Sequence, residues 1–191
     1  MRTLRQEISL LKDSPVRELV NKRIREFKKN KNFFSELCFC LLTANTSAEL
    51  GIKCQKECKG FKSFPEEKLA AELKSVGYRF YNRRAAFIVA AREHKAFALD
   101  RDWLMKNVKG IGMKEASHFL RNVGFDDYAI LDFHIIDVLV RHSIIKQPKT
   151  LTKTKYLEIE GKLRDLAKKT GLSLAELDLY LWYMETGKVL K

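Results

Sequence analysis

The fold of this chain is decided by the stretch Val108-Lys109-Gly110-Ile111-Gly112-Met113-Lys114, which Asp132 follows 18 residues after Lys114. A G-I-G turn between two helices exposes backbone N–H groups, and such groups bind a phosphate without any cofactor. We therefore expect Gly110 and Gly112 to anchor a phosphate backbone. Lys109 adds a positive charge directed at the same phosphate, and Lys114 can react with the sugar that carries it.

Lys114 is the candidate nucleophile. An amine attacks only in its neutral form, whereas a lysine with the unperturbed pKa of about 10.4 is almost entirely charged at neutral pH. Partial burial and the positive potential of a basic protein both favour the neutral form, so we expect both around Lys114. A neutral amine can attack the anomeric carbon of a nucleotide, expel the base and form a Schiff base with the opened sugar. The alternative is an ordinary surface lysine, one of 37 Lys and Arg residues.

Asp132 precedes the apolar segment Phe133-His134-Ile135-Ile136-Asp137-Val138-Leu139-Val140, which is the position of a helix N-cap. The helix dipole keeps a carboxylate at this position ionised, and an ionised carboxylate stabilises a developing sugar cation. The capping role and the catalytic role are therefore compatible. His134 lies on the same first turn, where it can donate a hydrogen bond to a phosphate or pack as an ordinary histidine.

Almost every other segment has helical periodicity. Start signals stand at Pro15, Pro65 and Ser173, and apolar residues recur at helical spacing in residues 15–29 and 33–42. No segment has a convincing strand pattern, so the sequence predicts an all-α chain. With candidate hinges near residues 28–31 and at the polar turn 124–127, we expect two helical subdomains. One comprises residues 31–126 and contains the hairpin, and the other is discontinuous, from residues 1–30 and 127–191.

The composition indicates a globular protein with a polyanionic partner. Apolar residues make up 46% of the 191, enough for a sizeable core. Lys and Arg exceed Asp and Glu by 37 to 24, and a net charge of +13 favours nucleic acid, although ribosomal or membrane-surface association would also fit the charge. No run approaches the ~18 apolar residues of a membrane span, and the N-terminus lacks a signal-peptide core. We expect a monomeric cytoplasmic protein.

All four cysteines lie in the first third of the chain, at Cys38, Cys40, Cys54 and Cys58. In a reducing compartment they form a metal site or part of the core. Cys38 and Cys40 lie about 200° apart around a helix, which is poor geometry for chelation. We therefore expect small core residues with one exposed thiol, and no metal.

The hairpin and Asp132-Phe133-His134 resemble the signature of the helix-hairpin-helix-GPD superfamily of DNA glycosylases. The resemblance implies two helical subdomains with the active site in the cleft between them. Leu41-Leu42-Thr43-Ala44-Asn45-Thr46-Ser47 resembles the superfamily's duplex-inserting segment, which implies that Asn45 fills the gap left by an extruded nucleotide. A lysine at position 114 is typical of bifunctional members, which excise the base and then break the strand by β-elimination.

Two departures from the superfamily's usual sequence narrow the choice among its members. The relatives with an iron–sulfur cluster carry four cysteines near the C-terminus, whereas every cysteine here precedes residue 60. That cluster is therefore not expected, and the resemblance implies no cofactor. Lys109 replaces the usual proline of the hairpin, which exchanges some rigidity of the turn for a charge directed at phosphate.

The whole chain is similar to the type 2 8-oxoguanine DNA glycosylase/AP lyase family, found in archaea and some bacteria. The similarity is carried by residues 109–124 and by the ending Gly187-Lys188-Val189-Leu190-Lys191. In that family the terminal lysine folds back to the base pocket, and an aromatic residue nine positions earlier stacks on the base. Lys191 and Trp182 have this spacing and match these two residues. The resemblance implies that Phe80 contacts the opposite face of the same base. Read without the resemblance, Trp182 is a core aromatic residue and Lys191 is a frayed terminal residue.

The resemblance implies base excision repair of double-stranded DNA containing oxidised guanine, in a prokaryotic cytoplasm close to the nucleoid. Recognition of 8-oxoguanine needs an acceptor for its N7–H, and the terminal carboxylate of Lys191 or a backbone carbonyl can supply it. Two alternatives remain. One is a glycosylase for another lesion, such as an oxidised pyrimidine, and the other is a helix-hairpin-helix module that binds DNA without chemistry.

Overall fold

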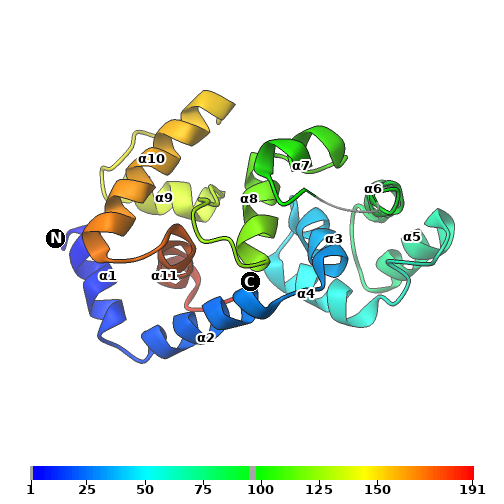
Figure 1. The fold of residues 1–191 in the computed structure, drawn as a ribbon, viewed down its shortest axis with the longest axis horizontal. Helices are drawn as coiled ribbons and strands as arrows, with labels where there is room; N and C mark the ends of the chain where they lie inside the picture. Colours follow the sequence, from blue (N-terminus) through cyan, green and yellow to red (C-terminus); the bar gives the residue numbers. More distant parts are fainter. Residues whose placement is uncertain (1, 95–97) are drawn as a thin grey trace. The chain divides into compact units, whose positions relative to one another are not determined.

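The computed structural model describes residues 2–94 and 98–191. Over these residues it contains eleven α-helices and no β-strand, which confirms the all-α prediction (Figure 1). Two compact units are formed, the first from residues up to 30 together with residues 120–191, and the second from residues 31–119. The division expected at residue 126 stays a prediction.

The first unit is built around its last helix. Its helices are α1 (Leu4–Lys12), α2 (Val16–Lys29), α9 (Phe133–Arg141), α10 (Lys153–Thr170) and α11 (Leu174–Thr186). α11 packs against the other four (Figure 1). It begins with the capping box predicted at Ser173, where Ser173 and Glu176 cap each other, and it ends at Gly187 with φ +68°. This placement makes α11 the framework on which the unit's other elements are held.

The core of the first unit includes Val16, Val20, Phe27, Leu179 and Tyr180. Leu19 is one of the apolar residues that recur along residues 15–29, but it is 51% exposed. It lies about 100° from its neighbour Val20 around the helix, outside the buried stripe.

The second unit comprises α3 (Phe33–Thr43), α4 (Ala48–Glu57), α5 (Glu66–Ser75), α6 (Tyr81–Ala91), α7 (Arg101–Asn107) and most of α8 (Met113–Asn122). α3 is its central helix, because every residue of α3 from Glu36 to Thr43 is buried. α4 and α6 pack against α3, and α5 packs against α6 (Figure 1). The segment that follows α3 is therefore attached to the buried centre of the unit.

All four cysteines are buried, so the expectation of one exposed thiol is wrong. Cys38 and Cys40 belong to the fully buried helix α3, and Cys54 lies on the buried face of α4. Burial raises the pKa of the Cys38 thiol well above its ordinary value. Within the described residues, no cluster of His, Cys, Asp and Glu is arranged to hold a metal ion. No helix of that same part of the chain has the length and apolarity to cross a membrane.

Candidate active site

The glycine hairpin lies between α7 and α8 and is fixed by its apolar residues. Val108 and Ile111 are buried, and the Ile111 N–H donates to the Val108 carbonyl at 3.2 Å. Gly110 has φ +87°, and a Cβ there would lie 2.3 Å from Cδ2 of Phe87. Only glycine therefore fits this position, whereas Lys109 beside it is exposed.

Lys114 lies on the first turn of α8 with its side chain 27% exposed. Its Nζ is 3.2 Å from Oε1 of Glu115, and Oε2 of Glu115 accepts a hydrogen bond from the Gly112 N–H at 3.3 Å. The amine of Lys114 therefore forms an ion pair with the residue that follows it in the chain. The positive potential expected around Lys114 is thus accompanied by one carboxylate at ion-pair distance. The sequence held the signal, because Glu three residues after the last hairpin residue is the spacing of a helix cap.

Asp132 is the N-cap of α9, as its position in the sequence predicted. Its Oδ1 accepts a hydrogen bond from the Ile135 N–H at 2.9 Å, and its backbone is extended. One oxygen thus satisfies the helix end, while the carboxylate stays at the positive end of the helix dipole.

A buried ion pair in the same unit was not predicted from the sequence. Arg121 donates to Asp178 of α11, and the Arg121 Nε also donates to Oδ1 of Asn122 at 3.0 Å. The two charged partners stand 57 residues apart in the chain, so no local pattern could have revealed them. Burial raises the pKa of Asp178 to about 6, while Arg121 acts in the opposite direction and the negative charge of Asp132 raises the pKa further.

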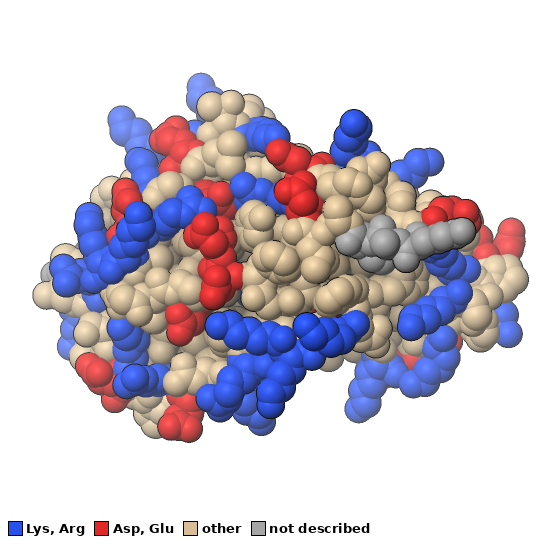
Figure 2. Space-filling model, in the orientation of Figure 1, with Lys and Arg blue, Asp and Glu red and all other residues tan. Residues whose placement is uncertain are grey.

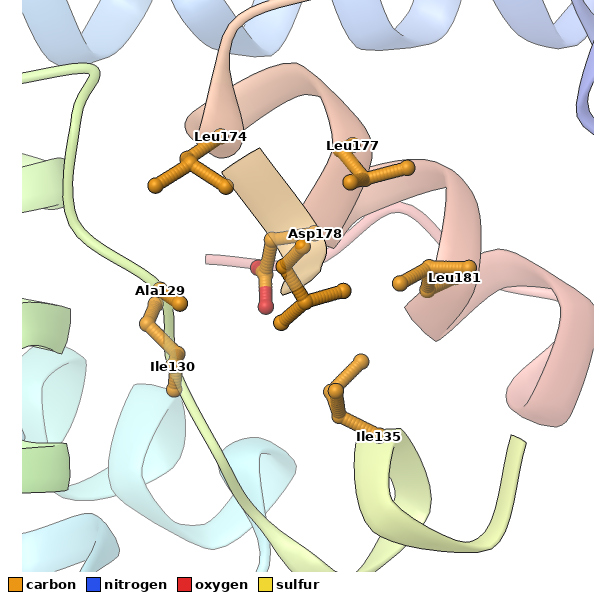
Figure 3. A pocket seen from close by; sticks show the side chains of 8 residues that line it. Ala129, Ile130, Ile135, Leu174, Leu177, Asp178 and Leu181 are labelled. Atoms are coloured by element: carbon orange, nitrogen blue, oxygen red, sulfur yellow. The ribbon is translucent and has the colours of Figure 1, made fainter. Parts of the chain in front are cut away.

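Asp178 is the single charged residue among the side chains that line a small pocket of the first unit. Figure 3 shows its carboxylate directed among apolar side chains, with Ala129 and Ile130 on one side and Leu181 on the other. Ile135, which donates its N–H to Asp132, also lines this pocket. The ion pair and the N-cap carboxylate therefore belong to one electrostatic environment.

The structure brings two of the predicted site residues into contact. The rings of His134 and Trp182 meet edge to face with their centroids 4.7 Å apart, while Phe133, 69% exposed, stacks 3.8 Å from His134. The Trp182 Nε1 is buried without a hydrogen-bond partner in the described structure. Lys191 is partly buried at the end of the tail.

That tail is anchored to the first unit. It follows the left-handed Gly187, and Val189 packs against the core cluster of α2 and α11. The tail is therefore attached to the first unit at Val189, two residues before Lys191.

Asn45 and Phe80 belong to the second unit, together with Lys109, Gly110, Gly112 and Lys114. Asn45 follows the end of α3, is exposed and has φ +63°. Phe80 is the partly buried N-cap residue of α6, with the Arg79 guanidinium 4.9 Å from the centre of its ring. Asp132, His134, Trp182 and Lys191 belong to the first unit.

Basic side chains gather on part of the surface. Figure 2 shows Lys and Arg side chains clustered over the C-terminal half of α2, where Arg25, Lys28 and Lys29 are exposed. Such a cluster attracts a polyanion.

An all-α chain in which a glycine hairpin leads to a lysine, with an N-capping aspartate 18 residues later, has the arrangement of a helix-hairpin-helix DNA glycosylase. A solved endonuclease III–DNA complex shares this fold, with a TM-score of 0.60 at 19% identity over 88% of this chain and 83% of that chain. Residues 20–172 match the family described as 8-oxoguanine DNA glycosylase, and the chain belongs to that family.

Two similar proteins come from Methanocaldococcus jannaschii. A curated protein named 8-oxoguanine DNA glycosylase/AP lyase is 50% identical over 203 residues, which cover 97% of this chain and 98% of the relative. The crystal structure of the 8-oxoguanine glycosylase/lyase in complex with 15mer DNA containing 8-oxoguanine has a TM-score of 0.94 at 50% identity, over 98% of this chain and 99% of that chain.

Proposed function

We propose that this protein is a bifunctional DNA glycosylase/AP lyase that excises 8-oxoguanine from double-stranded DNA and then cleaves the strand 3′ to the abasic site by β-elimination. The observation that carries the proposal is Lys114, which lies on the first turn of α8 directly after the glycine hairpin, in a member of the 8-oxoguanine DNA glycosylase family. The relative from Methanocaldococcus jannaschii, at 50% identity, carries both activities in its name.

Lys114 is the nucleophile of the proposed reaction. Its neutral amine attacks C1′ of the damaged nucleotide, the N–C1′ bond forms, and the glycosidic bond breaks with its electron pair leaving on the base, which takes up a proton. Ring opening gives the Schiff base, and loss of a proton from C2′ then expels the 3′ phosphate. Asp132 stabilises the positive charge that develops on the sugar and carries protons between these steps.

The hairpin positions the substrate for this attack. The amides of Gly110 and Gly112 bind a backbone phosphate, and Lys109 and His134 add contacts to phosphate. Because the Gly112 N–H also donates to Glu115, a phosphate at this amide must share or displace that hydrogen bond.

We propose Trp182, Phe80 and Lys191 as the residues that contact the extruded base. Stacking of the base on an aromatic side chain contributes about 1–3 kcal/mol, which offsets part of the stacking energy that the base loses when it leaves the duplex. The edge-to-face contact of His134 supports the orientation of the Trp182 ring. A hydrogen-bond acceptor beside the base, such as a backbone carbonyl, pairs with the N7–H that distinguishes 8-oxoguanine from guanine, since an unpaired buried polar group costs about 1–3 kcal/mol. Asn45 fills the space that the extruded nucleotide leaves.

Borohydride trapping on a panel of lesion duplexes tests the proposal. Wild-type protein should form a covalent adduct with an 8-oxoguanine duplex, and Lys114→Gln should not. Lys106→Gln, which removes one exposed charge from α7, is the matched control and should be trapped like the wild type. Base excision without any trapping would show that the amine mechanism is wrong.

The same panel separates the alternatives. Trapping on oxidised pyrimidine in place of 8-oxoguanine would reassign the substrate. Absence of product on every duplex, with Lys114→Gln only weakening DNA binding, would indicate a binding module. We further propose that the protein acts as a monomer in the prokaryotic cytoplasm. Light scattering of the protein with and without DNA tests its oligomeric state.

A further inference from the structure

The end of α3 is held by side chains from elsewhere in the second unit. The last carbonyls of a helix lack partners within the helix. Here the Leu42 carbonyl accepts hydrogen bonds from the Tyr78 hydroxyl, at 2.7 Å, and from the Thr46 hydroxyl. The Ala44 carbonyl accepts one from Nη2 of Arg84 at 2.9 Å. Two buried residues distant in sequence thus grip the turn that follows α3.

Arg84 is an unusual residue in this place. It is only 6% exposed, its Nε has no hydrogen-bond partner, and within the described residues it makes no ion pair. Its guanidinium carbon lies 5.5 Å from the centre of the Phe87 ring. Burying a charge without an opposite charge is unfavourable, and an apolar side chain of similar length would fill the same space. Stability of α6 therefore does not explain an arginine here.

The gripped turn presents Asn45 to solvent. Asn45 has φ +63°, a left-handed conformation that few non-glycine residues adopt and that asparagine tolerates better than most. Its neighbours are fixed on both sides, since the Thr46 N–H donates to the Thr43 carbonyl at 3.2 Å and Ala44 is bound by Arg84. An exposed side chain is thus mounted on a backbone that has little freedom to move.

We infer that Arg84 is a positioning residue for Asn45. Its hydrogen bond to Ala44, supported by that of Tyr78 to Leu42, fixes the turn from which Asn45 fills the space of the extruded nucleotide. The inference rests on the proposed function. A turn that is fixed before binding avoids the entropy loss of ordering it on DNA, and a small displacement of a positioning group lowers the rate strongly.

Arg84→Met tests the inference on two substrates. One duplex carries 8-oxoguanine opposite cytosine, and the other carries it opposite an abasic analogue, so that extrusion breaks no base pair. Single-turnover excision opposite cytosine should slow by about tenfold or more, whereas the other duplex should lose less than about threefold. Arg84→Lys, which keeps one donor for Ala44, should recover part of the rate opposite cytosine.

Three controls separate positioning from general damage. Arg83→Met removes an equal charge from an exposed neighbour on α6 and should slow both substrates alike, if at all. Circular dichroism and thermal unfolding should show Arg84→Met folded. If it does not fold, Tyr78→Phe, which deletes one hydroxyl, should give the same selective defect to a smaller extent.

Coupling to Asn45 provides the decisive measurement. In the double variant with Asn45→Ala, Arg84→Met should add no further loss opposite cytosine, because both act through one turn. Additive losses, or equal losses on the two duplexes, would overturn the inference. A wild-type protein that excises nothing would contradict the proposed function instead, whereas an active wild type with an equally active Arg84→Met contradicts only the positioning role.

Discussion

The carboxylate of Glu115 joins the two functional parts of the hairpin, because one oxygen lies 3.2 Å from Nζ of Lys114 while the other accepts the Gly112 N–H at 3.3 Å. The amine proposed to attack the sugar and an amide proposed to bind phosphate thus share one anionic partner. Glu115 therefore has two roles, as a cap of α8 and as the ion-pair partner of Lys114.

Glu115→Gln separates these two roles, because glutamine still accepts the Gly112 N–H but carries no charge. Because Nζ of Lys114 loses its ion-pair partner, the rate of borohydride trapping at neutral pH should increase by up to about fivefold, the limit set by a partly exposed ion pair of about 0.2–1 kcal/mol. Thermal unfolding should be nearly unchanged. Slower trapping by an equally stable variant would mean that the carboxylate instead accepts the proton of the amine.

Gly110→Ala should destabilise the protein by about 2–4 kcal/mol, because alanine is strained at φ +87° and its Cβ would lie 2.3 Å from Phe87. Gly112→Ala is the matched comparison, since its Cβ meets only Oε2 of Glu115, at 3.2 Å. Urea unfolding of both variants measures the difference. Equal losses of stability would contradict the steric explanation.

Deletion of Lys191 should reduce discrimination between 8-oxoguanine and guanine by tenfold or more while duplex affinity falls less than about threefold. The truncated chain keeps Val189, which anchors the tail to the core of the first unit. Single-turnover excision and fluorescence anisotropy measure the two effects. Unchanged discrimination would rule out the role of the tail in recognition.

The raised pKa of Asp178 predicts that the protein loses stability as pH rises through the weakly acidic range. Its pKa is raised from 3.8 to about 6, first by burial, so between these values the folded protein binds the proton that the unfolded chain releases. The free energy of unfolding therefore falls as pH rises from about 4 to about 6, by up to about 3 kcal/mol. Measured against Asp178→Asn, which cannot titrate, wild-type protein should lose stability over this range.

The opposite trend would be a free energy of unfolding that rises with pH in wild-type protein relative to Asp178→Asn. It would mean that Arg121 lowers the pKa of Asp178 more than burial raises it. Urea unfolding of both proteins at pH 4.5, 5.5 and 7 distinguishes the two results. Lys12→Gln, an unrelated substitution outside this pocket, should show no such difference from wild type.

Local features of the molecule were predictable from the sequence. The all-α fold, the capping box at Ser173, the N-cap at Asp132 and the hairpin at Gly110 and Gly112 each depend on residues a few positions apart. Capping, helical periodicity and left-handed turns are governed by short-range sterics and hydrogen bonds, which a stretch of sequence contains in full. The burial of Cys54 and the exposure of Leu19 are different, because they depend on what packs against each helix.

Only the tertiary structure decided which distant groups meet. The grip of Arg84 on Ala44, 40 residues away, and the pairing of Arg121 with Asp178 have no local signature. Contacts of this kind depend on how helices pack, which is set by the shape of the whole core rather than by any single segment. The sequence by itself therefore determined the chemical groups of the candidate site and the glycine turn before Lys114, whereas packing decided that Arg121 pairs with Asp178 and that Arg84 binds the turn of Asn45.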